Sequence, residues 1–394
     1  MHDPSSENLP LKGVKVIEFC SVAAGPFCGM LLADMGADVI KIEPPGGDTL
    51  RQWPPLNNGF SENFASLNRN KRSAQLDLKN TEDQRVAYHL ISDADVVIEN
   101  NRPGVMTRLG LGYDSFRDTR PSLVYCSISA YGQSGPRAEE GGFDLTMQAA
   151  AAVMSVTGMP NDAPVKCGVP ISDFASGLYA AYAIAAVLKR VGQGGRGGHI
   201  DVPMFGCTLG ISALQTSEFF GTGRSPVRLG SAHPRNAPYQ AFNAADGYFA
   251  IAAGNQKLWG AVCDVVGLPE LQNDPRFINT QQRATNQTLL KDILEDRFTE
   301  ESVEYWIAAF RSAGVPHARI NDYESALNDP QVKHMDWVLP LALPTGDITK
   351  TFAFPLRLDG VGFPIRRSPP STGEHTSEIR AALHASGKGC VNEN

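Results

Sequence analysis

The chain has 394 residues, of which 42% are hydrophobic and 20% charged, so it can bury more than one core. Its formal net charge is −7 and it has no long basic run, which excludes the pattern expected of a DNA- or RNA-binding protein. The seven cysteines include no C-x-x-C pair, so we expect neither a disulfide framework nor a bound metal.

The start of the chain is short and polar, with no basic segment leading into an apolar one, so no signal peptide is predicted. The longest apolar run, residues 174–188, is too short to span a bilayer and predicts a buried helix. These features predict a cytoplasmic protein with no membrane partner.

The first half of the chain alternates strand and helix patterns. Residues 14–19 and 38–43 are β-branched strands, and a helical pattern over residues 25–35 lies between them. Strand patterns return at residues 95–99 and 122–128. Such βαβ units imply parallel strands with right-handed crossovers. We therefore predict an α/β fold with a Rossmann-like, doubly wound parallel sheet.

The second half begins with the most regular helical pattern, residues 174–190, followed by a glycine-rich loop at 192–198 and a strand at 199–202. Residues 221–242 are rich in Gly, Pro, Ser and Arg, which indicates a domain boundary and a long loop. Short strands and amphipathic helices over residues 248–327 predict a second, smaller α+β domain.

Two segments have the composition of a nucleotide site. Small residues over 21–26 open the first helix, where a pyrophosphate would bind in such a fold. However, G-x-G-x-x-G is absent, and close strand–helix packing explains the same residues. Lys71 and Arg72, within residues 67–78, could hold phosphates or could lie on a solvated loop. Residues 99–104 follow a strand, at the end where ligands bind in such sheets. Arg108, about a turn later, is a further candidate for binding phosphate.

Asp173 is the sharpest catalytic candidate. It precedes an apolar helix, where an Asp is commonly a helix N-cap. A carboxylate at a helix N-terminus is also kept ionised by the helix dipole, as a nucleophilic carboxylate must be. The sequence pattern alone does not choose between these two roles.

Taken together, the chain resembles the family III CoA-transferases, which include formyl-CoA transferase and the carnitine CoA-transferases. Six segments carry the resemblance: AGPFCGMLLADMGADVIKIE (24–43), NRNKRS (68–73), DADVVIENNRPG (93–104), LGLGY (109–113), SISAYGQSGP (127–136) and GVPISDFASGL (168–178). They occur in order over nearly the whole chain, from residue 11 to residue 376. Residues 230–242 and 252–259 look most like the succinate-dependent branch of the family.

The resemblance implies an architecture. A large Rossmann-like CoA-binding domain would comprise residues 1–203 and 335–394, and a small domain residues 229–327. Residues 204–228 and 328–334 would link them. Two chains would form an interlocked homodimer.

The resemblance also implies a site. Asp173 is the expected nucleophile, and His233, Arg235 and Asn236 are expected in a substrate loop over residues 230–240. The expected CoA contacts are Val22, Ala23, Ala24, Lys71, Arg72, Asn100 and Arg108. Formyl-CoA transferase has a polyglycine loop where this chain has residues 230–240, so its loop mechanism and its oxalate preference are not carried over.

The chemistry expected from this resemblance is transfer of CoA from succinyl-CoA to a short dicarboxylate such as itaconate, glutarate, citramalate or malate. Asp173 would form a mixed anhydride and then an aspartyl-CoA thioester. The acyl-CoA is a substrate, and no permanently bound cofactor is expected. The free carboxylate of the dicarboxylate needs a donor, for which Arg235 is the first candidate, followed by Arg51 and Arg137.

Two other functions fit the same resemblance less well. A 2-methylacyl-CoA racemase would need a His in a G-H-D segment, whereas this chain has Gly142-Phe143-Asp144, and a phenylalanine cannot act as a base. A non-catalytic CoA-binding protein would require Asp173 to be only a helix cap.

Overall fold

The computed structural model describes residues 9–385. The chain forms two compact units. Unit 1 comprises Met1–Val153, Lys166–Gly223 and Gln331–Asn394. Unit 2 comprises Met154–Val165 and Arg224–Pro330. Each unit has its own hydrophobic core, described below.

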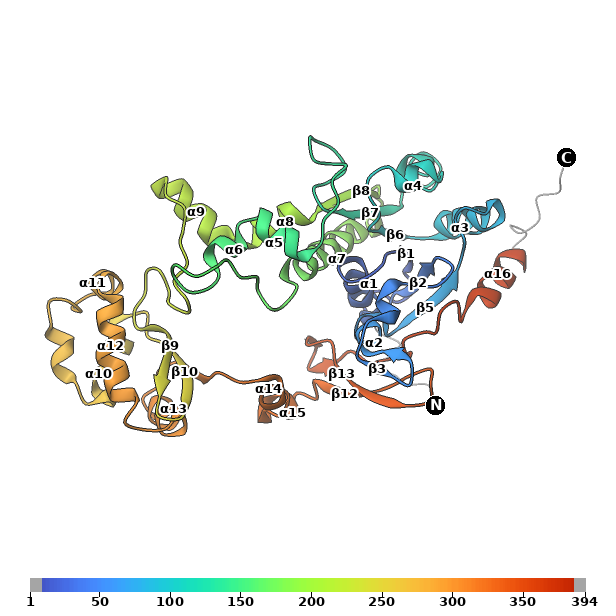
Figure 1. Cartoon of the computed structure of the whole chain (residues 1–394). Helices are drawn as coiled ribbons and strands as arrows, with labels where there is room; N and C mark the ends of the chain where they lie inside the picture. Colours follow the sequence, from blue (N-terminus) through green and yellow to red (C-terminus); the bar gives the residue numbers. More distant parts are fainter. Residues whose placement is uncertain (1–8, 386–394) are drawn as a thin grey trace. The chain divides into compact units, whose positions relative to one another are not determined.

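Unit 1 is built on a six-stranded, fully parallel sheet with the strand order β5-β2-β1-β6-β7-β8 (Figure 1). Its strands are β1 (Lys15–Phe19), β2 (Asp38–Glu43), β5 (Lys71–Gln75), β6 (Val96–Glu99), β7 (Val124–Ser129) and β8 (Gly198–Pro203). Counted along the chain these strands lie in the order 3-2-1-4-5-6, which is that of a doubly wound sheet. The predicted parallel α/β sheet is confirmed.

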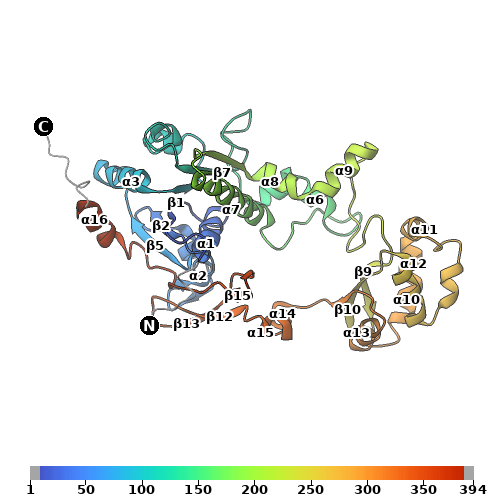
Figure 2. The same ribbon diagram turned by 180° about the vertical axis from the view of Figure 1, so that it is seen from behind.

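Alternate residues of the strands face two different helix layers, because side chains in a strand point to opposite faces. Val16 and its neighbours Val39 and Val96 pack with α1 (Ala24–Asp34) and α7 (Ile171–Gly192). The next residue, Ile17, lies in the core that includes α3 (Thr81–Asp93) and α16 (Thr376–Ala385). Figure 2 shows the same two layers from behind. With both faces covered, the central strands β1, β6 and β7 are almost entirely buried, including the charged residues Glu18 and Glu99.

Helix α7 differs from its prediction as a short, buried helix. It has 22 residues and is long and apolar enough to cross a membrane, yet only 33% of its apolar window is buried. Its inner face packs on α1, where a Cβ at Gly177 would lie 2.8 Å from the carbonyl oxygen of Ala24. The absence of a side chain at residue 177 therefore permits the close approach of the two helices. The outer face of α7 carries apolar side chains that unit 1 does not cover.

Unit 1 also contains shorter elements that support its edges. They are β3 (Leu56–Asn57), β4 (Phe60–Ser61), α2 (Glu62–Asn68), α4 (Val105–Arg108), α5 (Asp144–Ala150), α8 (Met204–Ile211), α9 (Ala213–Thr222), β12 (Val338–Ala342), β13 (Ile348–Phe352), β14 (Arg357–Leu358) and β15 (Val361–Gly362), with 3₁₀ turns η2 (Thr49–Gln52) and η3 (Tyr113–Ser115). Much of the predicted linker 204–228 is therefore helical, since Met204 and Cys207 pack into the core of unit 1. Helices α6 (Val153–Val156) and α15 (Pro330–His334) lie where the chain passes between the units.

Unit 2 has an antiparallel sheet with the order β11-β10-β9. Its elements are β9 (Tyr239–Ala244), β10 (Gly247–Ala252), α10 (Gln256–Val266), η4 (Pro269–Asn273), α11 (Thr280–Thr285), α12 (Gln287–Phe298), α13 (Val303–Ser312), β11 (His317–Arg319) and α14 (Tyr323–Leu327). Phe298 packs edge-on against Phe249, with the ring centroids 5.0 Å apart, at the centre of its core. The amphipathic helices predicted within residues 248–327 are present, and Ser302 caps one of them, α13, by accepting a hydrogen bond from the Tyr305 N–H.

Candidate active site

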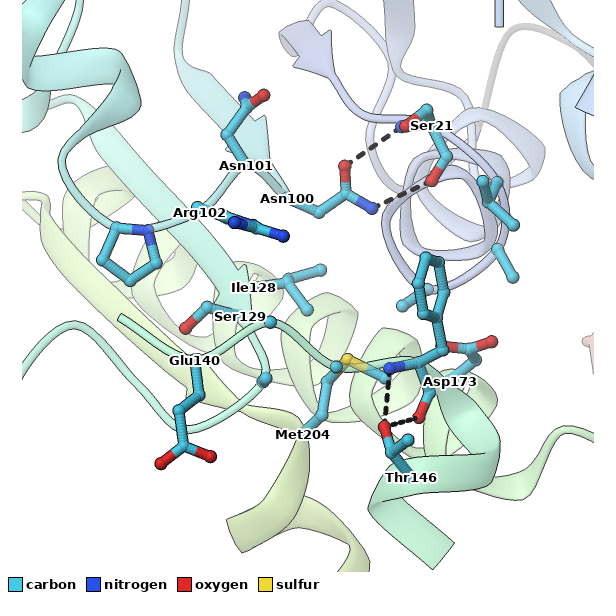
Figure 3. Close-up of a pocket in the computed structure, with 18 residues that line it drawn as sticks. Ser21, Asn100, Asn101, Arg102, Ile128, Ser129, Glu140, Thr146, Asp173 and Met204 are labelled. Atoms are coloured by element: carbon cyan, nitrogen blue, oxygen red, sulfur yellow. Dashed lines mark hydrogen bonds between the residues drawn. The ribbon is translucent and has the colours of Figure 1, made fainter. Parts of the chain in front are cut away.

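A cavity of about 460 Å³ lies in unit 1 where β1, β6, β7 and β8 end. Its walls are Ser21–Ala24, Asn100–Pro103, Ile128–Ala130, Glu140–Phe143, Thr146, Asp173 and Met204 (Figure 3). Strands β1 and β6 are neighbours whose crossovers run in opposite directions along the sheet. Ligands of doubly wound folds bind at such a switch point, outside the carboxyl ends of the strands.

The turn between β1 and α1 forms one wall of this cavity. Its backbone is joined to the loop after β6 by a side chain: Asn100 Oδ1 accepts a hydrogen bond from the Ser21 N–H at 3.0 Å, and Asn100 Nδ2 donates to the Ser21 carbonyl at 2.9 Å (Figure 3). No side chain caps α1. Since the first N–H groups of a helix have no partner within it, the start of α1 can present donors to an anion.

Asp173 also lines the cavity, from the first turn of α7. The N-cap of α7 is Pro170 and no side chain caps it, so the interpretation of Asp173 as an N-cap is wrong. The acceptor for an N–H group in the first turn of α7 comes from the neighbouring helix α5: Asp144 accepts a hydrogen bond from the Ser172 N–H at 2.9 Å. The Asp173 carboxylate is therefore free of a capping role and lines the cavity.

The surroundings of Asp173 disfavour its charge. Burial is the larger cause and the negative charge of Asp144 the smaller, and together they raise the pKa of Asp173 to about 7. Desolvation and a like charge therefore oppose the helix dipole, which was expected to keep this group ionised. A carboxyl group with a pKa near neutrality, facing a cavity, is typical of a functional site.

Five of the residues predicted for the site meet in this one cavity: Val22, Ala23, Ala24, Asn100 and Asp173. They come from three separate parts of the sequence. The topology of the sheet brings them together, because the carboxyl ends of parallel strands share one edge.

Lys71 is placed differently from its prediction as a CoA contact. Its ammonium group is fully buried and lies 2.8 Å from Glu18 Oε2. It also donates to the Pro26 carbonyl oxygen at 2.8 Å and to Asn68 Oδ1 at 2.9 Å. An ammonium group has three hydrogens. With three partners in place, Lys71 has no donor left for a phosphate, and the predicted direct contact is wrong.

Arg72 lies near the amino end of β5, whereas the cavity lies at the carboxyl ends of other strands. It binds Asp38, the first residue of β2, at 3.0 Å through Nε, and Glu378 of α16 at 3.0 Å through Nη1. Arg72 does not line the cavity that holds other predicted contacts. A CoA contact for Arg72 stays a prediction. Arg108 is exposed on α4 and its guanidinium folds back over Gly104. A CoA contact for Arg108 stays a prediction.

The arginine that lines the cavity is Arg102, which the sequence analysis did not single out. It follows β6 directly, and its side chain extends toward the interior of the cavity (Figure 3). Two other candidates are engaged elsewhere. Arg51 binds Glu43 at 2.6 Å and stacks on Phe64, and Arg137 is exposed and paired with Glu140. The position of Arg102 directly after a strand end was the available signal.

The predicted substrate loop lies in unit 2 and has an ordered structure of its own. His233 Nδ1 accepts hydrogen bonds from the N–H groups of Arg235 and Asn236, both at 3.1 Å, and its ring stacks on Tyr239. Burial, and then the charge of Arg235, lower the pKa of His233. Buried Arg283 donates to the Ala237 carbonyl oxygen at 2.8 Å. A substrate contact by His233, Arg235 or Asn236 stays a prediction.

The arrangement in unit 1 supplies the parts needed for acyl transfer through a carboxylate. Asp173 is the nucleophile candidate, and the start of α1 and Arg102 offer positive potential for an anionic ligand. Phe143 occupies the position where a racemase of this fold would need a base. The cavity therefore suits nucleophilic chemistry better than two-base proton transfer.

The chain is similar to known proteins in both sequence and structure. The sequence matches the model of CoA-transferase family III over residues 11–376. It is 34% identical over 391 residues to the succinate–glutarate CoA-transferase of Agrobacterium fabrum, covering 97% of this chain and 98% of that protein. It is 39% identical over 330 residues to the acetyl-CoA:oxalate CoA-transferase of Acetobacter aceti, covering 83% and 85%. A solved CaiB/BaiF family protein from Brucella suis matches with a TM-score of 0.85 at 37% identity, covering 96% of this chain and 100% of that one.

Proposed function

Because the chain belongs to CoA-transferase family III, we propose that it moves coenzyme A from succinyl-CoA to a short dicarboxylate, with Asp173 as the nucleophile. The observation that carries the assignment of the nucleophile is the Asp173 carboxylate itself. It lies in the switch-point cavity, is not used as a helix cap, and has a pKa raised to about 7.

The proposed reaction has four acyl transfers. The ionised Asp173 attacks the thioester carbonyl of succinyl-CoA, which gives a succinyl–aspartyl anhydride and the CoA thiolate. The thiolate attacks the aspartyl carbonyl, forms an aspartyl-CoA thioester and releases succinate. The acceptor carboxylate then attacks this thioester, and the thiolate released attacks the acceptor's carbonyl to give the new acyl-CoA and free Asp173. Each step exchanges one acyl bond for another, so none needs a permanently bound cofactor.

The CoA portion is proposed to lie along the turn Val22–Ala24 and the loop after β6. N–H groups at the start of α1 would face the pyrophosphate. Asn100 fixes this turn to the loop after β6, and Arg108, at the end of α4, is proposed as a further contact. Support for this placement comes from the shared cavity of Val22, Ala23, Ala24, Asn100 and Asp173.

The dicarboxylate proposal rests on a relative and on one side chain. The Agrobacterium fabrum relative carries succinate and glutarate in its name. Arg102 is the arginine of the cavity in unit 1 and could bind the free carboxylate in a two-pronged contact. It replaces Arg51 and Arg137 as candidates, while Arg235 remains one in unit 2.

We further propose that the protein is a cytoplasmic homodimer. The outer surface of α7, α8 and α9 exposes large apolar side chains, including Tyr182 at 74%, Leu214 at 62% and Phe220 at 80%. Exposed large apolar side chains on neighbouring helices are typical of a protein interface. An interlocked dimer predicts one dimeric species in sedimentation at every concentration, and a folded monomer on dilution would contradict it. Cell fractionation tests the location.

A substrate panel tests the proposed function. Succinyl-CoA and acetyl-CoA are each offered as donors against acceptors of two to six carbons, and the CoA esters are separated by chromatography. Succinyl-CoA with a dicarboxylate of four to six carbons should give the highest kcat/KM. A preference for oxalate or acetate over every such dicarboxylate would refute the substrate proposal and leave the role of Asp173 standing. In deuterated water, a 2-methylacyl-CoA should show no exchange at its α-carbon.

A further inference from the structure

Val22, in the wall of the cavity, has a backbone conformation that a valine rarely adopts. Its φ is +66°, in the left-handed region, where a β-branched side chain is strained. Such a conformation persists only where the surroundings hold it in place. The contact that holds it is visible: the Val22 N–H donates to both oxygens of Asp48, at 3.2 and 3.3 Å.

Asp48 is itself rigidly anchored and stands outside the cavity. It is 2% exposed and is not among the cavity-lining residues. It caps the η2 turn by accepting from the Leu50 N–H at 2.9 Å, and its Oδ2 lies 2.9 Å from the ammonium group of Lys41. Burial acts to raise the pKa of Asp48, but Lys41 and the two N–H donors outweigh it and hold the pKa below its usual value. Asp48 is therefore ionised and only accepts hydrogen bonds.

Other side chains hold the two ends of the same turn. Buried Lys41 donates to the Cys20 carbonyl oxygen at 2.6 Å, and buried Lys71 donates to the Pro26 carbonyl oxygen at 2.8 Å. Glu18 lies between the two ammonium groups, 3.1 and 2.8 Å from them. With both ends fixed, the backbone hydrogen bonds from Val22 to Asp48 set the conformation of the middle of the turn.

We propose that Asp48 is a positioning residue for the acyl-CoA, which acts by holding Val22 in its left-handed conformation. This inference rests on the proposed function, since it assumes that the turn at Val22 contacts CoA. The loss of Asp48 would let Val22 relax to a negative φ, which would turn the backbone that leads into the start of α1. Binding of CoA would weaken, whereas the chemistry at Asp173, on helix α7, would change little.

The test combines Asp48→Ala, which removes the acceptor of the Val22 N–H, with substitutions of Val22 itself. For Asp48→Ala we expect KM for the acyl-CoA, and Kd for free CoA in calorimetry, to rise about tenfold, with kcat within about twofold of wild type. Adding Val22→Gly should recover most of that loss, because glycine adopts a positive φ without strain. Adding Val22→Ala should recover none, since alanine keeps a Cβ and the strain of this conformation.

Two further variants separate this effect from general damage. Asp95 accepts a hydrogen bond from the Lys15 N–H at 2.9 Å where β1 and β6 begin, at the opposite end of these strands from the cavity, so Asp95→Ala is the matched control and should leave KM unchanged. Asp48→Glu keeps the charge beside Lys41 while displacing the carboxylate from Val22. It should show the same rise in KM and the same rescue by Val22→Gly, even if Asp48→Ala fails to fold.

The outcomes distinguish this inference from the proposed function. If wild-type protein does not bind free CoA, the proposed function fails and this inference fails with it. If wild type binds CoA and the Asp48 variants bind it equally well, only the positioning role is overturned. Equal rescue by Val22→Gly and Val22→Ala, or a loss confined to kcat, would overturn it too.

Discussion

The raised pKa of Asp173 predicts that the rate of transfer depends on pH, and that removing the neighbouring charge of Asp144 alters this dependence. The nucleophile must be ionised, and a group with a pKa of about 7 is roughly one-tenth ionised at pH 6 and nine-tenths ionised at pH 8. We therefore expect kcat/KM of the wild-type enzyme to rise about tenfold between these two pH values. An aspartate at its ordinary value of 3.8 would give no such rise.

Asp144→Asn tests the cause of this pH dependence. The substitution removes the like charge but keeps an oxygen that can accept from the Ser172 N–H, as Asp144 does now. The midpoint should move below 7 but should not return to 3.8, because burial is the larger cause and remains. Glu140 lines the same cavity but does not contribute to the shift at Asp173, so Glu140→Gln is the control and should leave the midpoint in place.

Initial rates of CoA transfer at saturating acceptor, measured from pH 5 to pH 9, give kcat/KM for the acyl-CoA at each pH. The reasoning is refuted if the wild-type profile is flat between pH 6 and pH 8. It is also refuted if Asp144→Asn leaves the midpoint unchanged or raises it. Circular dichroism across the same pH range separates titration of the site from loss of the fold.

Three other perturbations have definite outcomes. Arg102→Ala should raise KM for dicarboxylate acceptors or for acyl-CoA at least tenfold, since a charged hydrogen bond is worth about 1.5–3 kcal/mol. Arg137→Ala, on the exposed surface, is the control, and equal effects of the two variants would contradict the assignment of Arg102. Gly177→Ala should lower the free energy of unfolding by about 1–3 kcal/mol, because the added Cβ would clash with the Ala24 carbonyl oxygen of α1. Denaturant unfolding measures this loss, and Gly192→Ala, where the added Cβ meets open space, is the control. Above pH 7, Asp173→Asn should be at least as stable as wild type. The pKa of Asp173 is higher in the folded than in the unfolded protein, so the wild-type fold loses stability as pH rises between these two pKa values. A lower Tm for Asp173→Asn than for wild type at pH 8 would count against this reasoning.

The sequence was sufficient for the features that depend on local pattern and chain order. The alternation of strands and helices predicted a parallel doubly wound sheet, and that topology brings Val22, Asn100 and Asp173 to one edge. The Asp173 motif matched the family as a whole, so the nucleophile could be proposed before any geometry was known.

The features that the sequence did not predict depend on which side chains meet in three dimensions. Lys71 and Arg102 are both cationic residues near strands, but Lys71 lies beneath the turn with Glu18, whereas Arg102 faces the cavity. No spacing rule distinguishes an arginine with an acidic neighbour in the fold, such as Arg51, from one without. The pKa of Asp173 likewise depends on Asp144, which is 29 positions away.

The most direct test of the central claim is to trap the covalent intermediate on Asp173. Enzyme incubated with succinyl-CoA without acceptor, quenched in acid and digested, should yield one modified peptide, containing Asp173 and carrying a CoA thioester, in mass spectrometry. Asp173→Ala should give no adduct and no transfer while still binding free CoA. An adduct on another residue, or transfer by Asp173→Ala near the wild-type rate, would contradict the account.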